Sequence, residues 1–230
     1  MIELRQFAPK FGLLNASPFC MKVEVFLRLA GLPYTTRSAM PMRTPKGKLP
    51  VLVDGVTVAD SEAILAHLQA TYRDRIPAAL ATPETPSELM LRRMLEEHLY
   101  FAALYFRWVE DAGWAHTRGF FDDVPAPLRG LVCGLVRRKM KRDLIGQGLG
   151  RHSRAEIGAK AIADLDAMAG FLGERAYFAG AAPGAIDASA YAFLANLLWV
   201  PIETPVKDHA AALPALVAYC GRMKAAVGGD

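Results

Sequence analysis

Ser17 and Cys20 are the residues of this chain whose types and spacing best suit chemistry on sulfur. They flank a Pro-Phe pair in the run Asn15-Ala16-Ser17-Pro18-Phe19-Cys20. Serine is a favoured N-cap and proline suits the first helical position, so a helix is predicted to begin here. The free N–H groups and partial positive charge of a helix N-terminus stabilise an anion. A hydroxyl at this point can donate a hydrogen bond to a bound thiolate and lower the pKa of that thiol.

Both side chains also have an ordinary structural interpretation. Taken alone, Ser17 is a capping residue, which is a very common use of serine. Cys20 stands three residues into the predicted helix, where a side chain tends to face the interior, and a buried cysteine behaves as a small hydrophobe. If Cys20 is instead accessible, it could form a mixed disulfide with a small thiol.

Two further motifs could bind the rest of a small anionic ligand. Lys48-Leu49-Pro50-Val51 places a proline at the mouth of a short predicted strand. Asp60-Ser61 stands directly before an apolar-periodic segment, residues 61–72, which is predicted to be a helix. The amide and hydroxyl of Ser61 would form an anion site at that helix N-terminus. By itself, Asp-Ser before a helix is also a plain capping signal, and an exposed lysine such as Lys48 is usually idle.

The elements around these motifs form a small α/β unit. Residues 2–7 alternate as a strand, a helix runs from residue 17 to Gly31, and a second strand begins at Pro33-Tyr34. Residues 49–53 and 56–59 are predicted as strands joined by Asp54-Gly55 in a type I′ turn, before the helix of residues 61–72. This order, βαβ and then ββα, is that of the thioredoxin-like fold.

The second half of the chain is patterned for helices. Prolines and threonines in residues 76–86 indicate a linker between a domain of residues 1–75 and an all-helical domain of residues 87–230. Gly184-Ala185-Ile186-Asp187 is similar to a capping box, in which Asp187 would accept from the amide of residue 184 as a structural cap. Helices are expected over residues 87–113, 125–145, 154–172, 186–200 and 213–227.

Tyr100, Tyr105 and Trp108 lie on the first of these helices and could line a pocket for a hydrophobic co-substrate. Aromatic residues at helical spacing also serve as core, so both interpretations stay open. The basic run of residues 137–142 suits a solvated helix face, a polyanion or a membrane surface.

Composition narrows the class of protein. With 230 residues, 53% hydrophobic and 22% charged, the chain can bury a sizeable core and is not disordered. The net charge of +4 lies in residues 1–80, which suits a small anionic ligand better than nucleic acid. Three widely spaced cysteines predict neither disulfides nor a metal site and favour a reducing cytoplasm. The longest apolar run, residues 188–202, is shorter than the ~18 to 20 residues that cross a bilayer.

The three motifs, in this order and at these separations, resemble the glutathione transferase superfamily. The resemblance implies a thioredoxin-like α/β N-terminal domain, an all-α C-terminal domain, glutathione as co-substrate and a homodimer. It implies that Ser17 activates the glutathione thiol and that the Leu49–Pro50 bond is cis, so that the Leu49 main chain pairs with the cysteinyl group of glutathione. Asp60 and Ser61 would hold the γ-glutamyl group and Lys48 the glycine carboxylate. The superfamily more often has Glu or Gln before this serine than Asp.

Within the superfamily, Phe11-Gly12-Leu13, Gly31-Leu32-Pro33-Tyr34 and Gly150-Arg151-His152-Ser153 are similar to the metaxin and failed-axon-connections branch. That branch contains bacterial transferase-like proteins and membrane-associated scaffolds. Three functions therefore stay open. The protein could be a transferase that conjugates glutathione to a small hydrophobic electrophile through Ser17. It could be a non-catalytic binding module, or a glutathione-dependent thiol reductase that uses Cys20.

Overall fold

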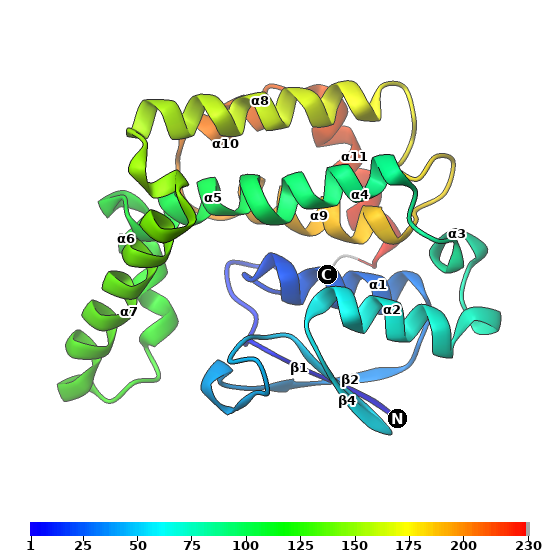
Figure 1. Ribbon diagram of the computed structural model, residues 1–230, viewed down its shortest axis with the longest axis horizontal. Helices are drawn as coiled ribbons and strands as arrows, with labels where there is room; N and C mark the ends of the chain where they lie inside the picture. The colour runs from blue at the N-terminus through cyan, green and yellow to red at the C-terminus, as the bar shows by residue number, and fades with distance from the viewer. Residues whose placement is uncertain (229–230) are drawn as a thin grey trace.

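The computed structural model describes residues 1–228, and its first third is the small α/β unit that the motifs predict (Figure 1). The sheet has the strand order β2-β1-β3-β4, with β1 and β2 parallel and the other two pairs antiparallel. This topology is thioredoxin-like, as predicted. Its elements are β1 (Ile2–Gln6), α1 (Pro18–Leu29), β2 (Tyr34–Ser38), β3 (Val51–Asp54), β4 (Val56–Ala59) and α2 (Ser61–Thr71).

The turn between β3 and β4 differs from the prediction. Asp54 pairs with Val56, so Gly55 alone occupies the turn. A type I′ turn requires positive φ at both central residues, whereas Gly55 has a φ of 69° and Asp54 is not in that region. The Asp54 carboxylate is held by α2 and the residue after it, because it accepts from the Tyr72 hydroxyl at 2.8 Å and lies 3.1 Å from His67 Nε2.

The rest of the described chain is mostly helical: residues 86–108 and 154–226 lie over α1, and the helices within residues 111–147 lie to one side of it (Figure 1). The helix predicted over residues 87–113 is divided: a π-helical turn, η3 (Leu95–Leu99), joins α4 to α5, and a new helix begins after residue 110. Two short helices were not predicted, and one of them, α3, lies within the expected linker, where Leu80 is buried. The helices are α3 (Ala78–Ala81), α4 (Pro86–Met94), α5 (Tyr100–Trp108), α6 (Asp111–Thr117), α7 (Ala126–Gln147), α8 (Arg154–Leu172), α9 (Ala185–Leu198), α10 (Pro205–Ala211) and α11 (Pro214–Ala226).

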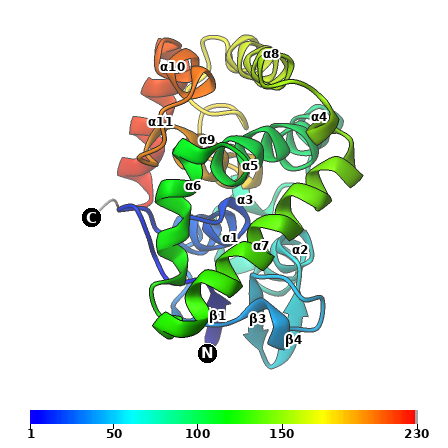
Figure 2. The same cartoon turned by 90° about the vertical axis from the view of Figure 1, so that its left-hand side faces the viewer.

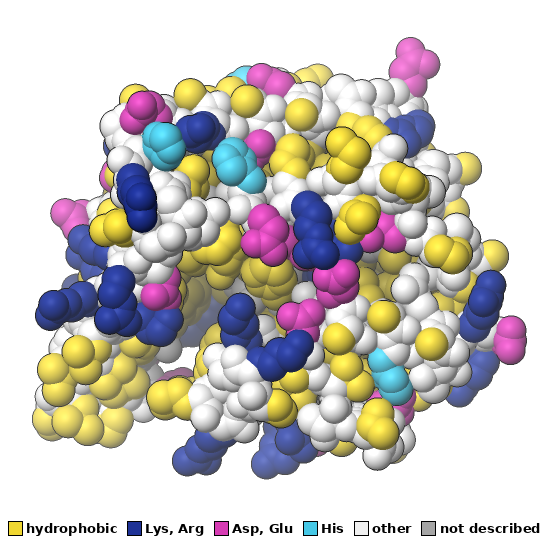
Figure 3. Space-filling view, in the orientation of Figure 1, with side chains coloured by type: hydrophobic (Ala, Val, Ile, Leu, Met, Phe, Trp, Pro, Cys, Tyr) yellow, Lys and Arg dark blue, Asp and Glu magenta, His cyan; other side chains and the backbone are white. Residues whose placement is uncertain are grey.

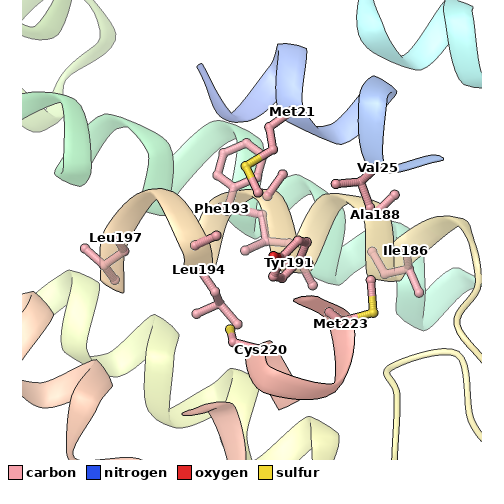
Figure 4. Packing of buried hydrophobic residues seen from close by; sticks show 14 of the residues in the cluster. Met21, Val25, Ile186, Ala188, Tyr191, Phe193, Leu194, Leu197, Cys220 and Met223 are labelled. Carbon is pink, nitrogen blue, oxygen red and sulfur yellow. The ribbon is translucent and has the colours of Figure 1, made fainter. Parts of the chain in front are cut away.

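α9 is the central helix, and its packing joins the two parts of the molecule in one hydrophobic core. In Figure 4, Met21 and Val25 of α1 point toward α9 from one side, and Cys220 and Met223 of α11 approach it from the other. A buried ion pair crosses the same boundary, because Lys22 of α1 donates to Glu96 of η3 over 2.6 Å. Since a buried charge is costly without a partner, this pair specifies how α1 meets the helical part.

The start of α9 depends on Asp187, which is completely buried. One carboxylate oxygen accepts from the amide of Gly184 at 2.9 Å, and the other accepts from the amide of Phe178 at 2.7 Å. Burial raises the pKa of this carboxyl group, although these amides act in the opposite direction. Glycine replaces the usual hydroxyl residue at 184 because a Cβ there would lie 2.6 Å from the Cβ of Ala179.

Candidate functional site

The three sequence motifs meet at one edge of the sheet. Cys20, in the first turn of α1, packs against Leu49 and the first residue of β3, and Ala59 at the end of β4 borders the same cluster. Ser17 lies one turn before Cys20, and Asp60 directly follows Ala59. The N-termini of α1 and α2 therefore approach the segment before β3 from two sides.

Ser17 is the N-cap of α1, yet within residues 1–228 its hydroxyl forms no capping hydrogen bond to the helix. Its main-chain amide donates to Oδ1 of Asn15 at 3.0 Å, and Pro18 has no amide hydrogen. The side chain is half-buried. Ser17 thus does not perform the ordinary capping role, and its hydroxyl can donate to an anion at the N-terminus of α1.

Cys20 is fully buried in the cluster between α1 and β3. Burial raises the pKa of its thiol to about 12, and the nearby Ser17 side chain offsets only part of that rise. The thiolate is the reactive form of cysteine, so the environment of Cys20 is that of an inert, structural thiol.

Alkylation of the native protein should separate the three cysteines. At pH 8 a thiol with a pKa of about 12 is ionised in roughly one molecule in 10,000, so iodoacetamide should leave Cys20 and the similarly buried Cys220 unmodified. Cys133 on α7 is half-exposed and should be labelled first, as peptide mass spectrometry would show. Labelling in urea provides the control, because all three cysteines should then react. Native labelling of Cys20 at the rate of Cys133 would contradict this assignment.

The Leu49–Pro50 peptide bond is cis, as the resemblance implied. The Leu49 side chain is buried against Cys20, and Leu49 itself lies two residues before β3. Within residues 1–228 it pairs with no neighbouring strand. Its main-chain N–H and C=O groups are therefore available to an extended peptide, which could pair with them as an added strand pairs with the edge of a sheet. Lys48, next to it, is exposed.

Asp60 has an unusual backbone conformation, with a φ of 98° and a ψ of 132°. Non-glycine residues rarely adopt positive φ, and such strain concentrates at functional sites. Its Oδ1 accepts from the amide of Glu62 at 3.0 Å, so Asp60 caps α2. Ser61, the first residue of α2, is buried with 6% of its surface exposed. The strained residue thus presents the N-terminus of α2 to the same edge of the sheet as Ser17.

The three aromatic residues that could line a pocket or serve as core contact different neighbours. Tyr100 packs edge-on against Phe19 of α1, with 4.9 Å between ring centroids, and lines a narrow crevice between α1, α5 and α9. Trp108 belongs to another cluster and packs on Phe121 at 6.4 Å. Tyr105 turns toward Glu110, and burial together with that carboxylate raises the pKa of its hydroxyl. A helix turns about 100° per residue, so side chains five and eight positions after Tyr100 face other neighbours.

An aromatic contact that the sequence reasoning missed joins the loop before α1 to the segment after α6. Phe11, in the loop before α1, packs on Phe120 at 5.4 Å, and Lys10 donates to the carbonyl of Gly119 at 3.2 Å. Figure 2 shows α6 and α7 in front of α1 and the sheet. In Figure 3, a hollow with hydrophobic side chains in its wall separates this lobe from the N-terminal part. No local signal indicates the contact, because its two sides lie more than a hundred residues apart.

Two polar residues of the helical part hold the segment that leads into Ser17. Arg107 of α5 donates to the carbonyl of Ala16 at 2.6 Å, and Asn196 of α9 donates to the carbonyl of Asn15 at 3.1 Å. Each interrupts an apolar stretch of its helix, which is a signal that could have identified them from sequence. Both are buried.

Within residues 1–228 no group of three or more His, Cys, Asp or Glu side chains is arranged to hold a metal ion. No helix in the same range is both long and apolar enough to span a membrane.

Comparisons with known proteins agree with this geometry. The family model for the glutathione S-transferase N-terminal domain matches residues 18–113, and that for the C-terminal domain matches residues 161–223. The isoprene-epoxide glutathione S-transferase of Rhodococcus sp. (strain AD45) is 29% identical over 97% of this chain and 98% of its own length. Failed axon connections of Drosophila melanogaster is 28% identical over 97% of this chain and 57% of its own length. Metaxin-3 of Xenopus laevis is 27% identical over 98% of this chain and 76% of its own length.

Solved structures share the fold. Glutathione S-transferase III in its apo form superposes with a TM-score of 0.64 at 18% identity, covering 97% of this chain and 91% of that one. Rice GST1 in complex with glutathione has a TM-score of 0.62 at 15% identity, and the superposition covers 98% of this chain and 88% of that one. Two domain models that together span most of the chain, and a relative matched over nearly its full length, lead to one conclusion about the family. The chain belongs to the glutathione S-transferase superfamily, in the branch that contains the metaxins and failed axon connections.

Proposed function

We propose that this protein is a glutathione transferase that joins the sulfur of glutathione to a small hydrophobic electrophile. The observation that carries the proposal is the hydroxyl of Ser17 at the N-terminus of α1, which within residues 1–228 forms no capping hydrogen bond to the helix. This hydroxyl lies at the same edge of the sheet as the N-terminus of α2 and the main chain of Leu49, which pairs with no strand in the described part of the chain. A peptide with an anionic sulfur and two carboxylates matches these three features.

Each part of glutathione has a complementary group. The cysteinyl main chain would pair antiparallel with Leu49, as a strand adds to the edge of a sheet. The γ-glutamyl carboxylate would bind the amide and hydroxyl of Ser61 at the start of α2, while the Asp60 oxygen that does not cap the helix takes the ammonium group. The glycine carboxylate lies within the field of the exposed Lys48, in the part of the chain that carries the net positive charge.

The chemical step proposed for Ser17 is activation of the thiol. Its hydroxyl donates to the glutathione sulfur and, with the free amides of the first turn of α1, stabilises the thiolate. With an epoxide, the sulfur forms a bond to one ring carbon while the bond from that carbon to oxygen breaks. The resulting alkoxide takes a proton from water. An epoxide is the first electrophile to test because the full-length relative from Rhodococcus is an isoprene-epoxide glutathione S-transferase.

The other two functions differ in what supports them. A non-catalytic binding module is supported by the similarity to metaxin-3 and failed axon connections, and it would keep the fold without conjugating glutathione. A reductase is disfavoured, because it would need a reactive Cys20 and that thiol is buried with a pKa of about 12. A homodimer and a cytoplasmic location are part of the transferase proposal.

The purified protein should be retained on immobilised glutathione and should conjugate glutathione to a small epoxide. Ser61→Ala should weaken binding about tenfold, because it removes a charge-assisted hydrogen bond worth roughly 1.5 kcal/mol and leaves the main-chain amide in place. Titration calorimetry gives the dissociation constant. Ser87→Ala, an exposed serine of α4, is the matched control and should bind as the unaltered protein does.

Three outcomes separate the functions. Binding with conjugation supports the transferase. Binding of glutathione with no conjugation of epoxides or other electrophiles supports the binding module. Passage through the column, with no heat of binding at millimolar glutathione, removes glutathione from the proposal altogether. An unchanged dissociation constant for Ser61→Ala would place the γ-glutamyl group elsewhere.

A further inference from the structure

Arg107 is a buried arginine that has no carboxylate partner within residues 1–228. Only 9% of its surface is exposed, and its three hydrogen bonds go to uncharged oxygens of Ala16 and Asn196. Burial lowers the pKa of its guanidinium to about 10. The titratable group that acts on it is the hydroxyl of Tyr100, two turns earlier on the same face of α5, and that hydroxyl is neutral at physiological pH.

The other buried cations of the described chain are neutralised. Lys22 pairs with Glu96, and Arg92 reaches Glu62, Glu84 and Glu96. This contrast within one molecule matters because desolvating an uncompensated charge is unfavourable, and a neutral amide could donate to the same carbonyl groups. The positive charge of Arg107 therefore requires an explanation other than hydrogen bonding alone.

The place where Arg107 acts is the peptide group before Ser17. The carbonyl of that group, on Ala16, accepts from Nη1 of Arg107 at 2.6 Å, and its amide, on Ser17, donates to Asn15 Oδ1 at 3.0 Å. Asn15 is in turn fixed, because its side chain donates to the carbonyl of Phe7 at 2.7 Å and its own carbonyl accepts from Asn196 at 3.1 Å. Both ends of the Ala16–Ser17 peptide are thus held, one of them directly from the helical part.

We propose that Arg107 is a positioning residue for Ser17, which it orients by holding the Ala16 carbonyl, and that its uncompensated charge favours the thiolate bound there. This inference rests on the proposed role of Ser17. The guanidinium lies behind the first turn of α1, on the side of that turn that faces α5 and α9. A thiolate in front of the turn would supply the negative charge that Arg107 lacks, in a poorly hydrated region where such attraction is weakly screened. In this arrangement the helical part completes a site whose binding groups all come from the α/β part.

The test is the thiol pKa of bound glutathione, measured from the ultraviolet absorbance of the thiolate against pH. Arg107→Met removes charge and donors, whereas Arg107→Gln keeps an amide donor. Both should raise the bound thiol pKa by about one unit. At pH 7 conjugation should fall about tenfold in Arg107→Gln and further in Arg107→Met. At pH 9, where the thiol ionises unaided, only Arg107→Met should remain slow, because only it loses the orienting donor. Arg222→Met is the matched control. Arg222 lies on α11 and also donates to a main-chain carbonyl, that of Ala176.

Other results would overturn the proposal. If both variants lose thermal stability while the bound thiol pKa and the rate at pH 9 stay unchanged, Arg107 is merely structural. If Ser17→Ala shifts the pKa and the Arg107 variants do not, the proposed function stands and this inference alone fails. If the unaltered protein binds glutathione without lowering its thiol pKa, both fail together.

A second variant covers the case in which neither Arg107 variant folds. Asn196→Ala keeps the guanidinium but removes the hydrogen bond that Asn196 donates to the Asn15 carbonyl and the one that its Oδ1 accepts from Arg107 Nη2. It should leave the bound thiol pKa within 0.3 units of the unaltered protein and lower kcat several-fold at unchanged KM, because orientation is lost and charge is kept. An unchanged kcat would overturn the positioning role.

Discussion

Ser17→Ala should raise the thiol pKa of bound glutathione by about one to two units. A hydrogen bond to a charged group is worth roughly 1.5 to 3 kcal/mol, and one pKa unit corresponds to about 1.4 kcal/mol. With a higher pKa, a smaller fraction of the bound thiol is ionised at pH 7, so conjugation should fall about ten- to a hundredfold there. The loss should shrink toward pH 9, where the thiol ionises without help. Thiolate absorbance against pH, and the rate at both pH values, measure these effects.

Cys20→Ala is the matched control for Ser17→Ala, because it alters the other candidate of the same motif. It should leave the thiol pKa and the conjugation rate nearly unchanged, since the Cys20 thiol is buried and protonated. If Ser17→Ala has no effect on either quantity while Cys20→Ala abolishes activity, the transferase assignment is wrong. The thiol chemistry would then belong to Cys20.

Glu96→Leu should destabilise the protein by about 3 to 5 kcal/mol, the usual cost of removing one partner of a buried ion pair. The substitution leaves the ammonium group of Lys22 with none of its surface exposed and without its carboxylate. Arg92 is less affected, because it keeps Glu62 and Glu84. Urea unfolding, with a reduced midpoint at an unchanged slope, measures the loss.

Two further variants make this expectation specific. Glu97→Leu changes the exposed neighbouring residue and should alter stability by less than about 0.5 kcal/mol. Lys22→Met combined with Glu96→Leu should recover most of the loss, because an apolar pair can replace a buried ion pair at little cost. If Glu96→Leu proves as mild as Glu97→Leu, water must reach Lys22. The pair would then not hold α1 against η3.

The parts of the fold that could be predicted are those with local causes. The start of α1 follows from Ser17-Pro18 and the periodicity after it, and α8 begins and ends at the predicted residues because Ser153 and Gly173 flank a regular pattern. The prediction for the β3–β4 turn was wrong because the Asp54 carboxylate is bound by His67 of α2 and by Tyr72. This tertiary contact overrides the turn preference of Asp-Gly. Short α10 was missed because seven residues are too few to show a period.

The residues of the candidate site also fall into those with a local cause and those that depend on tertiary contacts. Ser17, the Leu49–Pro50 bond and Asp60-Ser61 could be named because each is a short motif at the end of an element. Arg107 and the Phe11–Phe120 contact could not, since they act across about 90 to 110 residues of chain and depend on how α5 and α6 fold back. The positive φ of Asp60 could not be predicted either, because most aspartates have negative φ even though aspartate adopts positive φ more often than most residues.

The burial of α1 on both sides has a consequence for how this protein can change over generations. Nine of its twelve residues are buried, some against the sheet and others, such as Met21 and Val25, against α9. A substitution on the α9 side therefore has to be accommodated by a second gene region more than 150 residues away. Residues on the two sides of this contact therefore have to change together. A chimaera of this N-terminal half with the helical half of another transferase would leave Lys22 buried and unneutralised unless that half also places a carboxylate where Glu96 lies.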